Sequence, residues 1–347
     1  WSMKMKKLGR TGLMVTENSF GALPIQRIDQ KSAVELLHMA YDAGINYYDT
    51  ARAYTDSEEK LGAAFHDRRS SIVISTKSQG KTKQQVLDDL DTSLKNLRTD
   101  YVDILQLHNI ASFPDPQDPD GIHAALEEAR KQGKCRFIGI TSHRRPVAEA
   151  AAKSGLYDTV QFPVSHISPQ EDIDLIDLCG KLDVGFIAMK ALSGGLITCA
   201  QAAYAFFQQI PTAVPIWGIQ KKEELQQFLD CAQQGITMTP ELQAVIEKDR
   251  KELAGNFCRG CGYCMPCREG IQINTIARLP QLLRRSPWQQ YMTEEWCKEM
   301  EKVENCRRCG ACESKCPYGL NCTQLLRESL EDWKQFRKEK GYTDHID

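Results

Sequence analysis

Short apolar runs alternate with amphipathic stretches over the first 240 residues of the chain. The amphipathic stretches follow helical spacing; in residues 83–97, for example, Val86, Leu90 and Leu94 recur on one stripe. The apolar runs are rich in β-forming residues and have the length of strands. They occupy residues 46–50, 72–76, 102–108, 137–142, 159–164, 185–189 and 213–219.

Seven strand–helix units are visible in this pattern, and residues 19–22 supply the tip of an eighth strand. Such alternation is typical of parallel strands joined by crossover helices. The number of units and their span of roughly 250 residues favour a closed (β/α)8 TIM barrel over an open doubly wound sheet. No Gly-x-Gly-x-x-Gly follows the first strand, which argues against a Rossmann fold. Residues 7–13 predict a small hairpin that plugs the barrel floor.

The alternation ends near residue 240. Residues 239–241 open a helix, and the chain beyond it combines cysteine runs with helical stretches and no convincing strand. We therefore expect a barrel at residues 3–240 and a small helical domain at residues 241–347. From residue 323 the chain is rich in charged residues, which indicates a solvated helical face, with a surface for docking a partner as the alternative.

Composition places the chain among ordinary globular proteins. Of its 347 residues, 41% are hydrophobic and 26% are charged, and the formal net charge is -2. This balance supports a full core and gives no reason to expect binding to nucleic acid or to an acidic membrane surface. Because no apolar run has the length to cross a bilayer and no signal-peptide pattern is present, we expect a cytoplasmic protein.

Cysteine usage divides the chain in two. Ten of the 14 cysteines fall between Cys258 and Cys322, and in a reducing compartment such closely spaced cysteines indicate metal ligands rather than disulfides. Zinc is one candidate metal, because paired Cys-x2-Cys units also build four-thiolate zinc sites. The cysteines form two runs, the first at Cys258, Cys261, Cys264 and Cys267 and the second at Cys306, Cys309, Cys312 and Cys316. Iron–sulfur clusters are favoured because three cysteines follow one another at x2 spacing in each run. The second run then ends with x3-Cys316-Pro317, as in bacterial ferredoxins.

In ferredoxins with two clusters, the fourth cysteine of each run binds the other cluster, so we expect two [4Fe–4S] clusters with crossed ligands. The first run departs from the ferredoxin pattern, because only two residues precede its last cysteine and Arg268 stands where proline is usual. The chain between the runs predicts helices, as in helical ferredoxins. Cys297 and Cys322 are interpreted as buried or free thiols. The first cluster is assigned Cys258, Cys261, Cys264 and Cys316, and the second is assigned Cys306, Cys309, Cys312 and Cys267.

Four polar residues stand at the ends of predicted barrel strands. Asp49 ends one strand, Tyr54 follows it five residues later, and Lys77 and His108 stand at the ends of the next two strands. Active sites of parallel barrels lie at the C-terminal ends of the strands, so these side chains are expected to converge. Taken singly, each is more simply interpreted as an ordinary strand-end polar group. Together, at successive strand ends, they favour catalysis.

The chemistry of these four residues suits the reduction of a carbonyl group. Hydride reaches the carbonyl carbon while a proton goes to the oxygen, and a tyrosine hydroxyl can donate that proton. Lys77 is expected to lower the pKa of Tyr54 by favouring the phenolate, and Asp49 is expected to keep Lys77 charged. His108 is expected to hydrogen-bond the oxygen and to orient the substrate.

The chain resembles the aldo-keto reductase family, with a C-terminal iron–sulfur extension, over nearly its whole length. The resemblance implies a (β/α)8 barrel, NADP(H) as cofactor, and reversible reduction of a small aldehyde or ketone. It assigns the family's catalytic tetrad to Asp49, Tyr54, Lys77 and His108. The motifs that carry it are residues 7–13, Asp49-Thr50-Ala51-x-x-Tyr54-x-x-Ser57-Glu58, Ser75-Thr76-Lys77 and Leu105-Gln106-Leu107-His108.

The resemblance also implies a nicotinamide site. Ser142, His143 and Gln161 stand where the family holds the carboxamide, and Met189 stands where an aromatic residue usually stacks on the ring. The loop after the eighth strand is expected to bind the 2′-phosphate, although Gln227-Phe228 replaces the Glu-Asn pair that usually binds adenine. The start of a solvated helix is the alternative interpretation of the two lysines in this loop. The loop residues expected at the cofactor are Gly218, Gln220, Lys221 and Lys222.

Three functions remain open on the sequence alone. The first is a nicotinamide-dependent carbonyl reductase whose clusters are structural or accessory. The second is an electron-transfer reductase, in which the clusters pass single electrons to the barrel from a donor protein. Because a nicotinamide transfers two electrons at once, direct coupling needs a flavin, a radical-tolerant substrate or that external partner. The third is a redox or iron sensor without enzymatic activity, against which the intact tetrad argues. A flavin remains open as a cofactor, although no flavin motif is recognisable.

Overall fold

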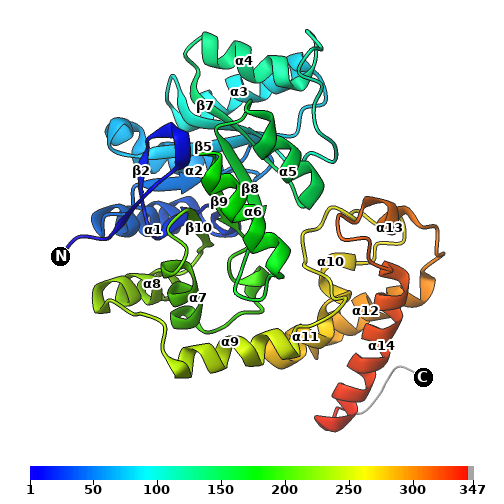
Figure 1. Cartoon of the computed structure of the whole chain (residues 1–347). Coiled ribbons are helices and arrows are strands. Elements are labelled where there is room, and N and C mark those ends of the chain that lie inside the picture. Colours follow the sequence, from blue (N-terminus) through cyan, green and yellow to red (C-terminus); the bar gives the residue numbers. More distant parts are fainter. Residues whose placement is uncertain (343–347) are drawn as a thin grey trace. The chain divides into compact units, whose positions relative to one another are not determined.

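The computed structural model describes residues 1–342, and the chain divides into two compact units (Figure 1). The first unit contains residues 1–191 and 199–244, and the second contains residues 192–198 and the chain from Val245 onward. Residues 192–198 lie inside the expected barrel domain but group with the second unit. None of the helices within residues 1–342 has the length and apolar character that a membrane crossing requires.

The first unit is a closed barrel of eight parallel strands in the order β10-β3-β4-β5-β6-β7-β8-β9. This topology confirms the predicted TIM barrel, and each predicted strand is present with its ends within two residues of the expected positions. The strands are β3 (Ser19–Gly21), β4 (Tyr47–Asp49), β5 (Val73–Ser78), β6 (Val102–Leu107), β7 (Cys135–Thr141), β8 (Thr159–Pro163), β9 (Gly185–Met189) and β10 (Ala213–Gly218).

Amphipathic helices connect the strands and cover the barrel (Figure 1). In α3 the predicted stripe is buried at Val86, Leu90 and Leu97, and the Thr82 hydroxyl caps the helix by accepting from the Gln85 N–H at 3.2 Å. The helices are α1 (Gln30–Asp42), α2 (Ser57–Phe65), α3 (Lys83–Leu97), α4 (Ile122–Lys131), α5 (Arg145–Ser154), α6 (Gln170–Lys181), α7 (Ala200–Gln208) and α8 (Lys222–Gln234). Short 3-10 segments occupy Gly9–Thr11, Pro24–Arg27, His66–Ser71 and Ser193–Gly195.

An N-terminal hairpin precedes the barrel, as predicted. Strands β1 (Met5–Lys7) and β2 (Met14–Thr16) pair antiparallel, and Leu8 in the turn between them is fully buried. Leu8 packs in one cluster with barrel residues that include Tyr47, Val73 and Ile104. These residues stand near the beginnings of their strands, so the hairpin fills the barrel at the end opposite the predicted active site.

The second unit is helical, and its described residues contain no strand. Arg278 donates to the Gly194 carbonyl at 2.8 Å and Arg285 donates to the Leu196 carbonyl at 3.0 Å, which explains why residues 192–198 belong to this unit. Helix α9 (Pro240–Glu252) begins in the first unit and continues into the second. The other helices of the second unit are α10 (Ile273–Ile276), α11 (Leu279–Arg285), α12 (Glu294–Glu301), α13 (Ala311–Lys315) and α14 (Cys322–Glu339), with 3-10 segments at Trp288–Tyr291 and Lys302–Asn305.

Helix α14 carries the charged tail of the chain, and only one side of it matches the predicted solvated face. Leu326, Leu330, Trp333 and Phe336 are buried, whereas the positions between them are largely exposed. Helix α14 is therefore an amphipathic part of the core of the second unit.

Gly9 and Gly12 form a matched pair for testing the hairpin plug. Both have a positive φ, +50° at Gly9 and +68° at Gly12, so an alanine is strained at either position. A Cβ at Gly9 would lie 2.2 Å from the backbone nitrogen of Gly185, whereas a Cβ at Gly12 meets nothing within 4 Å. We expect Gly9→Ala to lower the free energy of unfolding by about 1–3 kcal/mol more than Gly12→Ala in urea denaturation. Equal losses of unfolding free energy in the two variants would mean that the hairpin does not pack closely against the barrel.

Candidate functional site

The four predicted catalytic residues come from adjacent strand ends of the barrel. Asp49 is the last residue of β4, Lys77 lies next to the end of β5, and His108 directly follows β6. Tyr54 lies in the loop between β4 and α2. Because β4, β5 and β6 are parallel neighbours, their C-terminal ends meet at one edge and bring the side chains together.

Lys77 is the most tightly held group of this cluster. Its side chain is 1% exposed, and its Nζ donates to Asp49 Oδ2 at 2.7 Å, to the Thr50 carbonyl at 2.7 Å and to Tyr54 Oη at 3.4 Å. Burial works against the charged amine, but the Asp49 carboxylate and Tyr54 outweigh it, so the pKa of Lys77 lies above its ordinary value. The ammonium therefore stays charged at neutral pH.

The pKa of Tyr54 departs from the sequence expectation. Burial of the hydroxyl raises this pKa, and the Lys77 ammonium only partly offsets the increase. Lys77 does lower the pKa of Tyr54, as expected from the sequence. Desolvation of the phenolate is the larger effect, however, so the net pKa is raised. The phenol is consequently protonated at neutral pH and has a proton to donate.

His108 lies beside Tyr54. The two rings meet edge to face with their centroids 5.8 Å apart. Burial, followed by the positive charge of Lys77, holds the pKa of His108 well below its usual range, so the imidazole is neutral. Its buried Nδ1 has no hydrogen-bond partner among the described residues.

A buried polar network supports Asp49 from the barrel interior. Ser75 Oγ donates to Asp49 Oδ1 at 2.5 Å, and Gln161 Nε2 lies 3.5 Å from Asp49 Oδ2. Gln106 Nε2 in turn donates to Gln161 Oε1 at 2.8 Å. The role of Ser75 was missed from the sequence, although its place two residues before Lys77 puts both side chains on the same face of β5.

Glu58 clamps the loop that carries Tyr54, and the sequence analysis gave it no role. It is fully buried, pairs with Arg52 through one oxygen and accepts from Thr76 Oγ1 at 2.7 Å through the other. The Arg52 N–H donates to the Lys77 carbonyl at 3.0 Å. The loop after β4 is thereby fastened to the end of β5, which fixes Tyr54 relative to Lys77.

Residues expected at the nicotinamide lie at the same edge of the barrel. Ser142 and His143 follow β7, Gln161 is in β8, and Met189 is the last residue of β9. Burial, followed by the charge of Lys190, lowers the pKa of His143 to about 3, so this imidazole is also neutral.

The loop after β10 holds the remaining cofactor candidates. Gly218 ends β10, the Gln220 side chain accepts from Arg27 at 3.5 Å, and Lys222 pairs with Glu35 at 3.6 Å. Lys221 is exposed, and its backbone N–H donates to the Glu224 carboxylate at the start of α8. Arg27 is a basic neighbour that the sequence analysis did not include.

Phe228 occupies the core rather than a cofactor surface. It is 2% exposed and stacks on Trp217 with the ring centroids 4.1 Å apart. Phe228, which replaces one residue of the family's adenine-binding pair, therefore fills the space beneath α8. Its side chain is not presented to a ligand.

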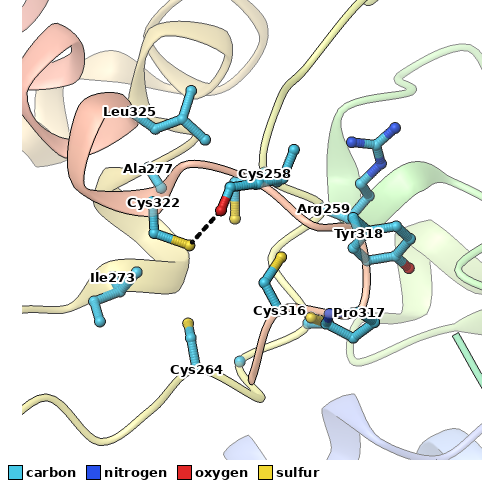
Figure 2. A pocket seen from close by; sticks show the side chains of 13 residues that line it. Cys258, Arg259, Cys264, Ile273, Ala277, Cys316, Pro317, Tyr318, Cys322 and Leu325 are labelled. Carbon is cyan, nitrogen blue, oxygen red and sulfur yellow. Dashed lines mark hydrogen bonds between the residues drawn. The ribbon is translucent and has the colours of Figure 1, made fainter. Parts of the chain in front are cut away.

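Cysteines of both runs line one cavity in the second unit. Its walls contain Cys258, Cys261, Cys264, Cys316 and Cys322, with apolar neighbours such as Ile273. Figure 2 shows the sulfurs of Cys264, Cys316 and Cys322 pointing toward one common space. The backbone N–H of Gly260 donates to Cys258 Sγ at 3.3 Å, a contact of the kind that stabilises cluster-bound thiolates. The structure thus groups Cys316 with the first run.

The chain next to Cys267 approaches the second run. Arg307, between Cys306 and Cys309, pairs with Glu269 at 2.8 Å. Both ends of this contact adjoin cysteines assigned to the second cluster, so the contact agrees with crossed ligation. Within residues 1–342, no three His, Cys, Asp or Glu side chains form a site for a single metal ion. A cubane binds one cysteine at each of four irons, so its ligands need not meet at one point.

The comparisons with known proteins agree with these two units. A family model described as the aldo/keto reductase family matches residues 12–209. The chain belongs to this family. A second model, the 4Fe-4S dicluster domain, matches residues 257–321. The resemblance noted from the sequence is confirmed, and this aldo-keto reductase is an oxidoreductase with an appended iron–sulfur domain.

Individual relatives of this aldo-keto reductase match more than half of its length. L-galactose dehydrogenase of Arabidopsis thaliana is 31% identical over 216 residues, covering 56% of this chain and 67% of that protein. The uncharacterized oxidoreductase YqkF of Bacillus subtilis is 29% identical over 212 residues, with the same coverage of each chain. The solved structure of an aldo-keto reductase from Bacillus halodurans has a TM-score of 0.62 at 22% identity, covering 71% of this chain and 96% of that one, which bears on the fold alone.

The pairing of Lys77 with Asp49 can be tested through stability. Asp49→Asn leaves a buried ammonium without its counter-charge, which we expect to cost about 3–5 kcal/mol at pH 7. Without Asp49, burial dominates and the folded-state pKa of Lys77 falls below its unfolded value. The unfolded state then binds more protons, so the stability of the variant rises with pH between these two values. The deficit relative to the wild type should therefore shrink from pH 7 toward pH 10 in urea denaturation.

Asp103→Asn is the matched control for this measurement. Asp103 is also buried, but it pairs with Arg69 at 2.7 Å and Arg136 at 3.0 Å. Arginine keeps its proton throughout this pH range, so the deficit of Asp103→Asn should stay constant. A constant deficit for Asp49→Asn as well would contradict the coupling of Asp49 to Lys77.

Proposed function

We propose that this aldo-keto reductase reduces the carbonyl group of a small aldehyde or ketone with NADP(H), and that Tyr54 donates the proton. The observation that carries the proposal is the buried Lys77 ammonium held between Asp49 and Tyr54. This arrangement provides a protonated phenol together with a fixed positive charge that stabilises the phenolate after proton transfer.

The chain's own residues divide the proton chemistry among them. When bound, NADP(H) supplies the hydride that reaches the carbonyl carbon. The Tyr54 hydroxyl gives its proton to the carbonyl oxygen, and Lys77 stabilises the phenolate that remains. Asp49 keeps Lys77 charged and in place. His108 is neutral and so carries one N–H that can donate to the substrate oxygen and orient the carbonyl.

Two of the residues proposed for the nicotinamide can accept further hydrogen bonds. Ser142 Oγ donates to the Ile110 carbonyl at 2.9 Å and accepts from the Arg144 N–H at 3.0 Å, which leaves one acceptor lone pair. Gln161 Oε1 accepts one bond from Gln106 and can accept another. These groups suit the carboxamide, with His143 and Met189 beside them. Around the phosphates and ribose we propose Gly218, Gln220, Lys221 and Lys222.

We further propose that the second unit holds two [4Fe–4S] clusters. The thiols that line the cavity of Figure 2 are the donor set that iron–sulfur clusters use, and the contact between Glu269 and Arg307 supports the crossed assignment. The first cluster takes Cys258, Cys261, Cys264 and Cys316, and the second takes Cys267, Cys306, Cys309 and Cys312.

Tyr54→Phe removes the proposed proton donor while keeping the ring. We expect turnover with NADPH and an aromatic aldehyde to fall by about 10²-fold or more, with folding unchanged. Tyr101→Phe is the matched control, because Tyr101 precedes β6 at the opposite end of the barrel, and this variant should keep wild-type turnover. Wild-type turnover in Tyr54→Phe would remove Tyr54 from the mechanism.

The cluster content can be measured directly. Anaerobically prepared protein should contain about eight iron and eight acid-labile sulfide per chain. Cys309→Ala should lose about half of both, whereas Cys297→Ala, which changes a cysteine outside the two runs, should lose none. Zinc without acid-labile sulfide would contradict the proposal.

A further inference from the structure

Cys322 lies in the cavity of the proposed first cluster although it belongs to neither cysteine run. The matched dicluster domain ends at residue 321, one residue before it. Cys322 is the first residue of α14, is 4% exposed, and lines the cavity together with four cysteines assigned to the cluster. Figure 2 shows its sulfur directed into the space that Cys264 and Cys316 also face. The cavity therefore offers five thiols to a cluster that binds four.

The position of Cys322 is held by the backbone around it. Thr323 donates to Glu313 through both its N–H at 3.3 Å and its hydroxyl at 3.0 Å, which fastens the beginning of α14 to α13. The Cys322 thiol has a weak hydrogen bond to the Leu320 carbonyl at 3.6 Å and another to Cys312. The bond to Leu320 is long and weak, so a Cys322 thiolate that turns to an iron gives up little by losing it. The bond to Cys312, a proposed ligand of the second cluster, is lost in the same movement.

Cys316 is the ligand that Cys322 is best placed to replace. The two cysteines stand at the ends of a single loop, residues 317–321, which turns at Gly319 with a φ of +63°. Cys322 also lines the same cavity as Cys316 and Cys264. An exchange therefore needs only a local shift of this loop, and the first run can keep its three cysteines in place.

We propose that Cys322 is an alternate ligand of the first cluster and binds its fourth iron when Cys316 does not. This inference rests on the proposed presence of the cluster. When the exchange occurs, the Cys322 thiol loses its proton and forms a bond to the iron, while the Cys316 thiolate leaves that iron and takes up a proton. One iron–thiolate bond thus replaces another, and the cluster keeps its electron count. The competing interpretation is that Cys322 is a small packing residue next to Ile273, Ala277 and Leu325.

The test removes Cys316 with and without Cys322, using alanine so that a serine oxygen cannot act as a ligand. Full-length Cys316→Ala should keep about eight iron and eight sulfide per chain, with an altered electron paramagnetic resonance spectrum after reduction. Cys316→Ala combined with Cys322→Ala should lose about four of each. The matched control, Cys316→Ala combined with Cys297→Ala, should keep them, because Cys297 in α12 does not line the cavity.

Cys322→Ala alone guards against a folding artefact and should keep a full iron content. Loss of four irons in Cys316→Ala alone would overturn the inference, and so would equal iron in the single and double variants. Loss of iron in Cys322→Ala alone would also overturn it, by making Cys322 an ordinary ligand. The iron and sulfide of the wild type test the proposed function separately, because they do not depend on how these variants compare.

Discussion

The buried ammonium of Lys77 is the constraint around which the barrel site is built. An isolated charge in a barrel interior is unfavourable unless it is paired and hydrogen-bonded. Asp49 from the neighbouring strand supplies the counter-charge, and the Thr50 carbonyl supplies a further acceptor. These contacts lock the ends of β4 and β5 together. The Tyr54 hydroxyl is then the third hydrogen-bond acceptor of the Lys77 ammonium.

The second unit depends on a different constraint. Residues 253–272 form no regular helix or strand, and several glycines in this stretch, including Gly260 and Gly262, take a positive φ. Such a chain lacks the repeating hydrogen bonds that hold the barrel, and small domains of this kind commonly rely on metal for stability. Thiols gathered around a shared cavity supply the ligands for that metal. We expect the cysteine loops to be organised around the clusters.

Much of the barrel follows from local patterns in the sequence. Strands such as β9 and helices such as α3 coincide with the predicted ranges. The spacing of apolar residues and the identity of the flanking residues determine these elements before any tertiary contact forms. The strand-end positions of Asp49 and Lys77 follow for the same reason. The spacing also predicts the grouping of Cys316 with the first run, and the shared cavity agrees with this grouping, although the cluster ligands themselves stay a prediction.

Other features depend on tertiary contacts that no local pattern encodes. Burial decides the direction of the Tyr54 pKa, and the stacking on Trp217 decides that Phe228 belongs to the core. The clamp by Glu58 depends on which side chains the closed barrel brings within reach. The place of Cys322 in the cavity was also not predictable from a local pattern, because it follows from the turn before α14 rather than from a repeated cysteine spacing.

The central claim is that the barrel transfers hydride from a nicotinamide while its own residues supply the proton. The most direct measurement uses anaerobic protein with both clusters, NADPH deuterated at the transferable C4 position, and an aromatic aldehyde. Mass spectrometry of the alcohol should find one deuterium on the carbinol carbon, while the cluster absorbance stays constant during turnover. An alcohol without deuterium, formed as the cluster absorbance bleaches and recovers, would contradict this account and would support one-electron transfer through the clusters.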